Sequence, residues 1–208
     1  MRPIFITTLI LTGLVAGCAT PNYKRAESAE KSAAAMRAGV AELQQSTEWS
    51  LAALRRLADL QDTDPHLAYL QLRNSTTDLE RRTRRMSCLS ARLRTRIAAY
   101  YDHWREELPA IQDEQMRLTS ANRRTILIDT YNRVPPLVTQ ARQQSQAYTA
   151  QLRDLEKYLG HDLTPAGIQS ATQFIERASQ AGRKLQTDLT ALTKELDTVT
   201  AALTSATR

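Results

Sequence analysis

The chain has few of the residues that build sheets and tight loops. Its 208 residues include two Phe, two Trp, two Cys and six Gly, and aromatic residues make up 5% of the total. Aromatic and aliphatic β-branched residues, which favour strands, are sparse, and no segment alternates cleanly between apolar and polar positions. The remainder is rich in Ala, Leu, Gln, Arg, Glu and Thr, most of which favour helices. The composition therefore predicts an all-α protein.

The common motifs of enzymes are also missing. The glycines are isolated, so no glycine-rich loop follows a strand to hold a nucleotide phosphate, and no serine stands in a nucleophile elbow. His66, His103 and His161 are not spaced as metal-binding pairs, and His161 is expected to cap a helix or contact solvent. Glu106 and Glu107 would point about 100° apart on a helix and are expected to be solvated. We therefore expect no catalytic residue, no metal and no small-molecule substrate.

The first residues combine a positive charge with a short apolar stretch. Arg2 precedes an uncharged run over residues 3–12, and residues 14–17 lead to Cys18 with small side chains just before it. This order is typical of a secretory signal. The apolar run is too short for a membrane-spanning helix, which needs roughly 20 residues. Residues 1–17 are therefore expected to form a signal peptide.

Small residues directly before Cys18 resemble the lipobox of bacterial lipoproteins. The resemblance implies that Cys18 is acylated on its sulfur and on its new amino group, and several acyl chains anchor a protein firmly. This covalent lipid is the only cofactor expected. Ala19 after the cysteine implies the outer membrane, with the protein facing the periplasm. The alternative is an ordinary signal peptide cut at another small residue, with Cys18 incidental.

Apolar residues recur at alternating steps of three and four along four long segments. Such a seam lines one side of a helix and buries it against partner helices. Three seams run over residues 36–57, 72–111 and 127–159. The clearest seam consists of Ile168, Ala171, Ile175, Ala178, Gly182, Leu185, Leu189, Leu192, Leu196, Val199 and Leu203.

Short joins separate these segments. An Asp-Thr-Asp-Pro turn at residues 62–65 ends the first segment, since proline disfavours helix in the residue before it. Gly160 is expected to end the third segment in a left-handed conformation. Thr164 is expected to cap the last helix, with Pro165 in its first turn.

Three prolines fall inside the seams. Pro109 is expected to kink its helix or to break it, and the pair Pro135-Pro136 to kink its helix or break it at one residue without forming a domain boundary. Residues 112–124 are nearly all polar, which predicts an exposed helix or a short turn.

The seams and joins predict helical segments over residues 25–61, 66–108, 110–159 and 165–206. Their short joins force neighbours to run antiparallel. We predict a single domain over residues 25–206, an elongated antiparallel helical bundle or coiled coil of about four long helices. Residues 18–24 would then form a short spacer between the lipid and the bundle. A helix of 40 residues is about 60 Å long.

Two further features have alternative interpretations. Cys88 would be the only free thiol if Cys18 is lipidated, and we expect it to be buried, as unpaired cysteines usually are. An intermolecular disulfide is the alternative. Tyr100, Tyr101 and Trp104 are expected to pack between helices, with a ligand groove as the alternative.

Positive charge is carried mostly by arginine, and the formal net charge is +6. Arg81, Arg85, Arg92 and Arg96 fall near one helical face. A basic face can bind phosphates, so anionic lipid headgroups or cell-wall polymers are candidate ligands. Nucleic acid is not an expected partner of an exported lipoprotein. The alternative is a solvated face that meets Glu or Asp side chains of a neighbouring helix.

Three stretches between about residues 100 and 170 carry a family resemblance. They contain Trp104, Glu106, Glu107 and Leu108; then Ile111, Asp113, Met116, Arg117 and Ser120; and last Arg153, Asp154 and residues 159–164. These stretches resemble a family of bacterial secreted proteins catalogued only as a domain of unknown function. Asp113, Gly160 and Asp162 depart from its pattern, which has Asn, Lys and Asn there. The resemblance implies an exported helical protein and brings no activity.

The sequence therefore predicts a lipid-anchored, non-enzymatic cell-envelope protein with a structural or protein-interaction role. Its expected partners are the membrane, through the lipid, and an envelope protein or a second copy of the chain. The alternative is a binding module for anionic lipid or cell-wall polymer through the four-arginine face.

Overall fold

The computed structural model describes residues 22–59 and 64–207, with side chains as far as Ser205, and these residues form helices and no strand. Cys18 and the expected signal peptide lie outside the described residues. No helix within them is both long enough and apolar enough to cross a membrane. In chain order the elements are α1 (Asn22–Ala58), α2 (Pro65–Glu107), the 3-10 turn η1 (Leu108–Ala110), α3 (Glu114–Asn132), α4 (Val134–His161), α5 (Pro165–Ser170) and α6 (Thr172–Thr207).

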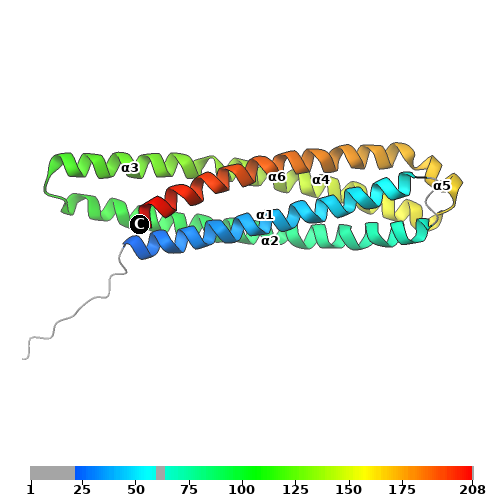
Figure 1. Cartoon of the computed structure of the whole chain (residues 1–208), viewed down its shortest axis with the longest axis horizontal. Helices are drawn as coiled ribbons and strands as arrows, with labels where there is room; N and C mark the ends of the chain where they lie inside the picture. The colour runs from blue at the N-terminus through cyan, green and yellow to red at the C-terminus, as the bar shows by residue number, and fades with distance from the viewer. Residues whose placement is uncertain (1–21, 60–63, 208) are drawn as a thin grey trace, which may run out of the picture.

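The long helices lie side by side along one axis (Figure 1). α1 packs against α2 and α6, and α4 packs against the same two helices from the other side. α3 continues the direction of α4 toward the end at which α1 begins, and it contacts α6, α4 and α2. The predicted all-α class and the elongated antiparallel bundle of long helices are confirmed.

The seams form the core of this bundle. Every member of the 165–206 seam is buried, and so is every member of the seam over residues 127–159. The seam of α2 weakens toward its end, where Trp104 and Leu108 are only partly buried. The alternation of three and four therefore predicts which side of each helix faces inward.

The helix starts follow the expected chemistry. The Asp64 side chain accepts a hydrogen bond of 2.9 Å from the Leu67 amide, and that of Thr164 accepts one of 3.2 Å from the Gly167 amide. Each satisfies one of the free amides in a first turn. Thr164 caps the short α5, however, because Ala171 divides the predicted last helix over residues 165–206 into α5 and α6. α1 begins at Asn22 instead of near Arg25, so residues 22–24 of the expected spacer are helical.

Gly160 does not end α4 in a left-handed conformation, because no described glycine has a positive φ and α4 continues to His161. The glycine instead makes room for Tyr69 of α2. A Cβ at residue 160 would lie 2.9 Å from the Tyr69 hydroxyl oxygen, which donates a 3.3 Å hydrogen bond to the Glu156 carbonyl. Close packing of α2 on α4 explains this residue.

The prolines act differently at the two sites. Pro109 lies in η1, where the chain reverses direction, so it breaks the helix instead of kinking it. Asp113 then caps α3 by accepting a 2.7 Å hydrogen bond from the Met116 amide. Before Pro135 the helix is interrupted only at Arg133, which is the predicted one-residue break. α3 is the expected exposed helix, since it buries only two of its residues, both near its end.

Polar contacts in the middle of the core fix the register of the helices. The fully buried hydroxyl of Tyr148 lies 2.8 Å from the Ser50 hydroxyl of α1. The Tyr148 ring packs on Gly182 of α6, where a Cβ would come within 2.8 Å of it. Burial raises the pKa of Tyr148 to about 12, against the smaller lowering effect of the Ser50 hydrogen bond. One side chain of α4 therefore connects three helices.

Candidate functional site

The four arginines predicted to form a face all project from α2. Arg81, Arg85, Arg92 and Arg96 are exposed, and their spacing of four, seven and four residues keeps them on one side of the helix. The structure therefore brings the predicted residues together as a surface. The members of this surface differ in their neighbours.

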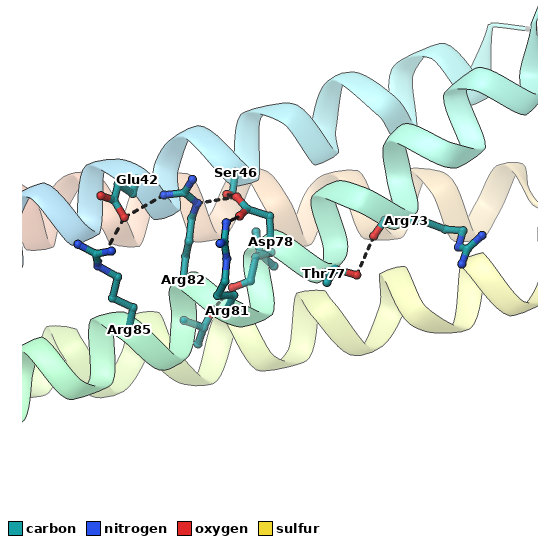
Figure 2. A network of polar contacts seen from close by, with 10 residues as sticks. Glu42, Ser46, Arg73, Thr77, Asp78, Arg81, Arg82 and Arg85 are labelled. Atoms are coloured by element: carbon teal, nitrogen blue, oxygen red, sulfur yellow. Dashed lines mark hydrogen bonds and ion pairs between the residues drawn. The ribbon is translucent and has the colours of Figure 1, made fainter.

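The first two arginines of this face are engaged by carboxylates (Figure 2). Arg81 pairs with Asp78 one turn earlier on α2, and the Arg85 Nε lies 3.7 Å from Glu42 of α1. Between them Arg82, which was not among the predicted site residues, bridges both carboxylates, with its Nη1 2.9 Å from Glu42 and its Nε 2.5 Å from Asp78. The expected alternative, in which the arginines meet acids of a neighbouring helix, holds for Arg85.

Asp78 is the centre of this network. It also accepts a hydrogen bond from Ser46 of α1, and its side chain is 15% exposed. Partial burial alone would raise its pKa, but the hydrogen bonds from Ser46, Arg82 and Arg81 outweigh burial and lower the pKa to about 2. The network therefore holds α1 and α2 together, with Asp78 ionised.

Arg92 and Arg96 form no ion pair or hydrogen bond with any described residue. Both guanidinium groups extend from the exposed side of α2. The predicted face is therefore divided into a neutralised half and a half with free positive charge.

The aromatic residues of α2 pack as predicted. The Tyr100 ring lies 5.2 Å from the Tyr101 ring and 5.5 Å from the Trp104 ring, centroid to centroid. The Trp104 indole nitrogen donates a 2.9 Å hydrogen bond to Ser120 of α3, and Arg124 of α3 donates one of 2.9 Å to the Tyr101 carbonyl. These contacts attach the exposed helix α3 to the end of α2.

A second aromatic cluster was not singled out from the sequence. Tyr158 of α4 and Phe174 of α6 are 42% and 49% exposed, with ring centroids 6.2 Å apart. The Arg177 guanidinium lies 5.4 Å from the centre of the Phe174 ring. Gln151, Asp154 and Leu155 complete a groove of about 320 Å³. Tyr158 and Phe174 stand off the seams, and an off-seam position is the signal that could have identified them.

Cys88 is exposed, so the prediction of a buried thiol is wrong. Its position explains the difference, because Met86 and Leu93 occupy the buried seam and Cys88 lies on the arginine side of α2. His66, His161, Glu106 and Glu107 are also exposed. Within residues 22–59 and 64–207, no group of three or more His, Cys, Asp and Glu is placed to hold a metal ion.

Comparisons with known proteins identify a family. A family model described as "Protein of unknown function (DUF2959)" matches residues 22–205, which extends well beyond the resemblance seen over residues 100–170. No curated protein and no solved structure matches this chain. The matched range spans the long helices of the bundle except for the last two residues of α6. The chain therefore belongs to the DUF2959 family of proteins of unknown function.

Proposed function

We propose that this protein is a lipid-anchored, non-enzymatic component of the cell envelope that holds a stiff helical bundle at the periplasmic face of the outer membrane and presents it to a protein partner. Cys18 would carry the lipid. Family membership does not add an activity to this proposal, so its support comes from the sequence of the N-terminal segment and from the distribution of surface residues on the bundle.

The observation that carries the proposal is that the start of α1 and an exposed aromatic pair lie at opposite ends of the bundle. α1 begins at Asn22, only a short distance in sequence after Cys18, at the end of the bundle from which α2 and α3 project (Figure 1). The exposed Tyr158 stands three residues before the end of α4, and the exposed Phe174 two residues after the start of α6. These helix ends lie beside α5, at the opposite end of the bundle (Figure 1). A lipid on Cys18 would therefore leave this pair on the part of the bundle farthest from the membrane.

Exposed aromatic side chains with an adjacent arginine are typical of protein contact surfaces. Aromatic residues and arginine are enriched at the centres of interfaces, where they contribute most of the binding energy. Tyr158, Phe174 and Arg177 provide such a group, and Leu155 adds an apolar floor to the groove. We therefore assign the partner contact to this surface, the Tyr158–Phe174 groove.

In-cell photo-crosslinking of the tagged full-length protein tests the assignment. A photoreactive amino acid replaces Asp154, which lines the groove, or Gln143, an exposed control position on the same helix. We expect one dominant envelope protein, or a second copy of the chain, to be captured from position 154 and not from position 143. Tyr158→Ala with Phe174→Ala should abolish the capture, and Cys18→Ala should abolish it by releasing the protein from the membrane.

Two results would contradict this proposal. Equal capture from positions 143 and 154 would show that the groove is not the contact surface. A Cys18→Ala variant that stays in the membrane fraction would show that Cys18 is not the anchor.

The half-face formed by Arg92 and Arg96 favours a second candidate function, the binding of anionic lipid or cell-wall polymer. These two guanidinium groups are exposed and lack carboxylate partners among the described residues, whereas Arg81 and Arg85 are paired. Arg92→Gln with Arg96→Gln should then weaken salt-sensitive binding to anionic vesicles more than Arg81→Gln with Arg85→Gln does. Equal losses of vesicle binding in the two double variants would show that binding depends only on the total charge of the protein.

A further inference from the structure

A groove between α2 and α4 lies beside the break that separates α3 from α4. Its volume is about 340 Å³, within the range of small-molecule sites. Arg94 lines it from α2 and Arg142 from α4. Tyr131 and Val138 form its floor and are nearly buried, at 9% and 7% exposure. The groove thus combines two cations with a sheltered apolar base.

The charge in this groove is not neutralised. No aspartate or glutamate is among its described lining residues, and neither Arg94 nor Arg142 forms an ion pair or a hydrogen bond with a described residue. Other arginines that face a neighbouring helix do find acids. Arg82 bridges Glu42 and Asp78, and the Arg153 Nε lies 2.9 Å from Glu80. Two free guanidinium groups in one groove favour an anion, since they match phosphate and carboxylate geometry.

Uncharged donors complete the groove. Ser90 and Tyr131 line it, and their hydroxyl groups make no hydrogen bond with any described residue. The hydroxyls of Ser87 and Thr139 donate to carbonyls of their own helices at 3.1 Å, as do most serines and threonines of the bundle. Burial raises the pKa of Tyr131, and the charge of Arg94 reduces this rise. The effect of Arg94 agrees with a guanidinium group close to the tyrosine hydroxyl. Four donors are therefore available to one ligand.

We propose that this groove binds the phosphate group of an anionic organic ligand. Arg94 and Arg142 hold the phosphate from opposite walls, Ser90 and Tyr131 donate hydrogen bonds to it, and Val138 contacts the organic part. The phosphate belongs either to a soluble phosphomonoester or to a phospholipid headgroup. The site is separate from the four-arginine face, because residue 94 lies about 200° around the helix from residues 92 and 96.

The neighbouring arginines of α2 provide a matched test. The full-length protein is titrated by calorimetry with glycerol 3-phosphate and, as an uncharged probe, with glycerol. Phosphatidylglycerol vesicles and neutral vesicles test the lipid source. The variants are Arg94→Gln, Arg142→Gln and the control Arg92→Gln, which removes the same charge two residues away. Thermal melting checks that each variant is folded.

We expect Arg94→Gln and Arg142→Gln each to weaken binding on the order of tenfold or more, since each removes a charge-assisted contact. Arg92→Gln is the control for the soluble probe only and should change the binding of glycerol 3-phosphate less than about twofold. Arginine-dependent binding of glycerol 3-phosphate would identify a soluble phosphomonoester, and the same dependence with vesicles alone would identify a headgroup.

Three outcomes would overturn the proposal. They are the absence of saturable binding to both phosphate probes, binding of glycerol as tight as that of its phosphate, and an equal loss of glycerol 3-phosphate binding in Arg92→Gln and Arg94→Gln. Vesicle binding that depends on Arg92 but not on Arg94 would likewise exclude the groove, and would support the exposed half-face instead.

Discussion

The two halves of α2 use arginine in different ways. In the first half, Arg81, Arg82 and Arg85 are tied to Asp78 or Glu42. In the second half, Arg92, Arg94 and Arg96 reach no carboxylate of the described residues, whereas Arg105 near the end of α2 pairs with Asp102 of its own helix. α1 accounts for much of this difference, since it runs antiparallel to α2 and its Gly39 meets Leu89.

Beyond that crossing point α1 presents a buried row of small residues to its neighbours. Ala26, Ala29 and Ala33 are fully buried, whereas the part of α1 beside the first half of α2 carries Glu42 and Ser46. The local density of arginine in the sequence is similar in both halves. Arg82 and Arg85 are therefore paired because α1 places Glu42 beside them, whereas Arg81 pairs with Asp78 of its own helix. In the second half, Arg92, Arg94 and Arg96 remain available to a ligand.

The largest expected effect concerns Tyr148, which lies in the core beside the paired half. Replacing it with alanine removes a fully buried ring packed on Gly182, and we expect the free energy of unfolding to fall by about 3–5 kcal/mol. Tyr148→Phe keeps the ring and loses only the Ser50 hydrogen bond, so it should cost about 1 kcal/mol. Urea unfolding measures both. Equal losses would show that the hydrogen bond, and not the packing, holds this part of the core.

The paired and unpaired halves should differ in stability when an arginine is removed. Arg82→Gln leaves Asp78 and Glu42 without their shared partner, and we expect a loss of about 2 kcal/mol, less than for a fully buried pair. Arg92→Gln should change the unfolding free energy by less than about 0.5 kcal/mol. Equal effects of the two substitutions in urea unfolding would remove the distinction between the halves.

Acid should weaken the paired half selectively. The folded pKa of Asp78, about 2, lies below its ordinary value of 3.8, so its ionised form stabilises the protein above pH 3.8. This contribution is lost as the pH falls from about 4 toward 2. Asp78→Asn should therefore be less stable than wild type at neutral pH, and the difference should shrink over that range. Unfolding midpoints measured from pH 2 to 7 that fall in parallel for both proteins would contradict the assignment.

The smallest expected effect concerns Cys88. Because the thiol is exposed, Cys88→Ala should change the unfolding free energy by less than about 0.5 kcal/mol. In the native protein a thiol reagent should react with Cys88 almost as fast as in urea. A protein lipidated on Cys18 should take up one label per chain. Slow native labelling would place Cys88 in a contact with a partner or a second copy.

The sequence predicted most of the fold because the core is periodic. The seam from Ile168 to Leu203 continues across the one-residue break between α5 and α6, and every member of it is buried. The same periodicity places Cys88 outside the seam of α2. The expectation that Cys88 is buried was wrong because it relied on the usual burial of unpaired cysteines and not on this position. Gly160 was misjudged, and a break at Pro109 could not be distinguished from a kink, because the packing of Tyr69 and the reversal at η1 depend on the neighbouring helices.

The candidate sites were less predictable, because they depend on how the helices are aligned. Glu42 and Arg82 are distant in sequence, and only the offset of α1 against α2 brings them to 2.9 Å. Arg94 and Arg142 meet in one groove for the same reason. A single sequence shows which side of each helix is apolar but not the offset between helices, so the paired and unpaired arginines could not be separated from it.

Urea unfolding with and without saturating glycerol 3-phosphate tests the difference between the two halves most directly. A ligand present at 100 times its dissociation constant stabilises a folded protein by about 2.7 kcal/mol. Arg82→Gln should lower the unfolding free energy yet keep the full stabilisation by the ligand. Arg94→Gln should keep the unfolding free energy and lose that stabilisation. If both variants lost stability alike, or if the ligand stabilised neither them nor the wild type, the division between fold-forming and ligand-binding arginines would be contradicted.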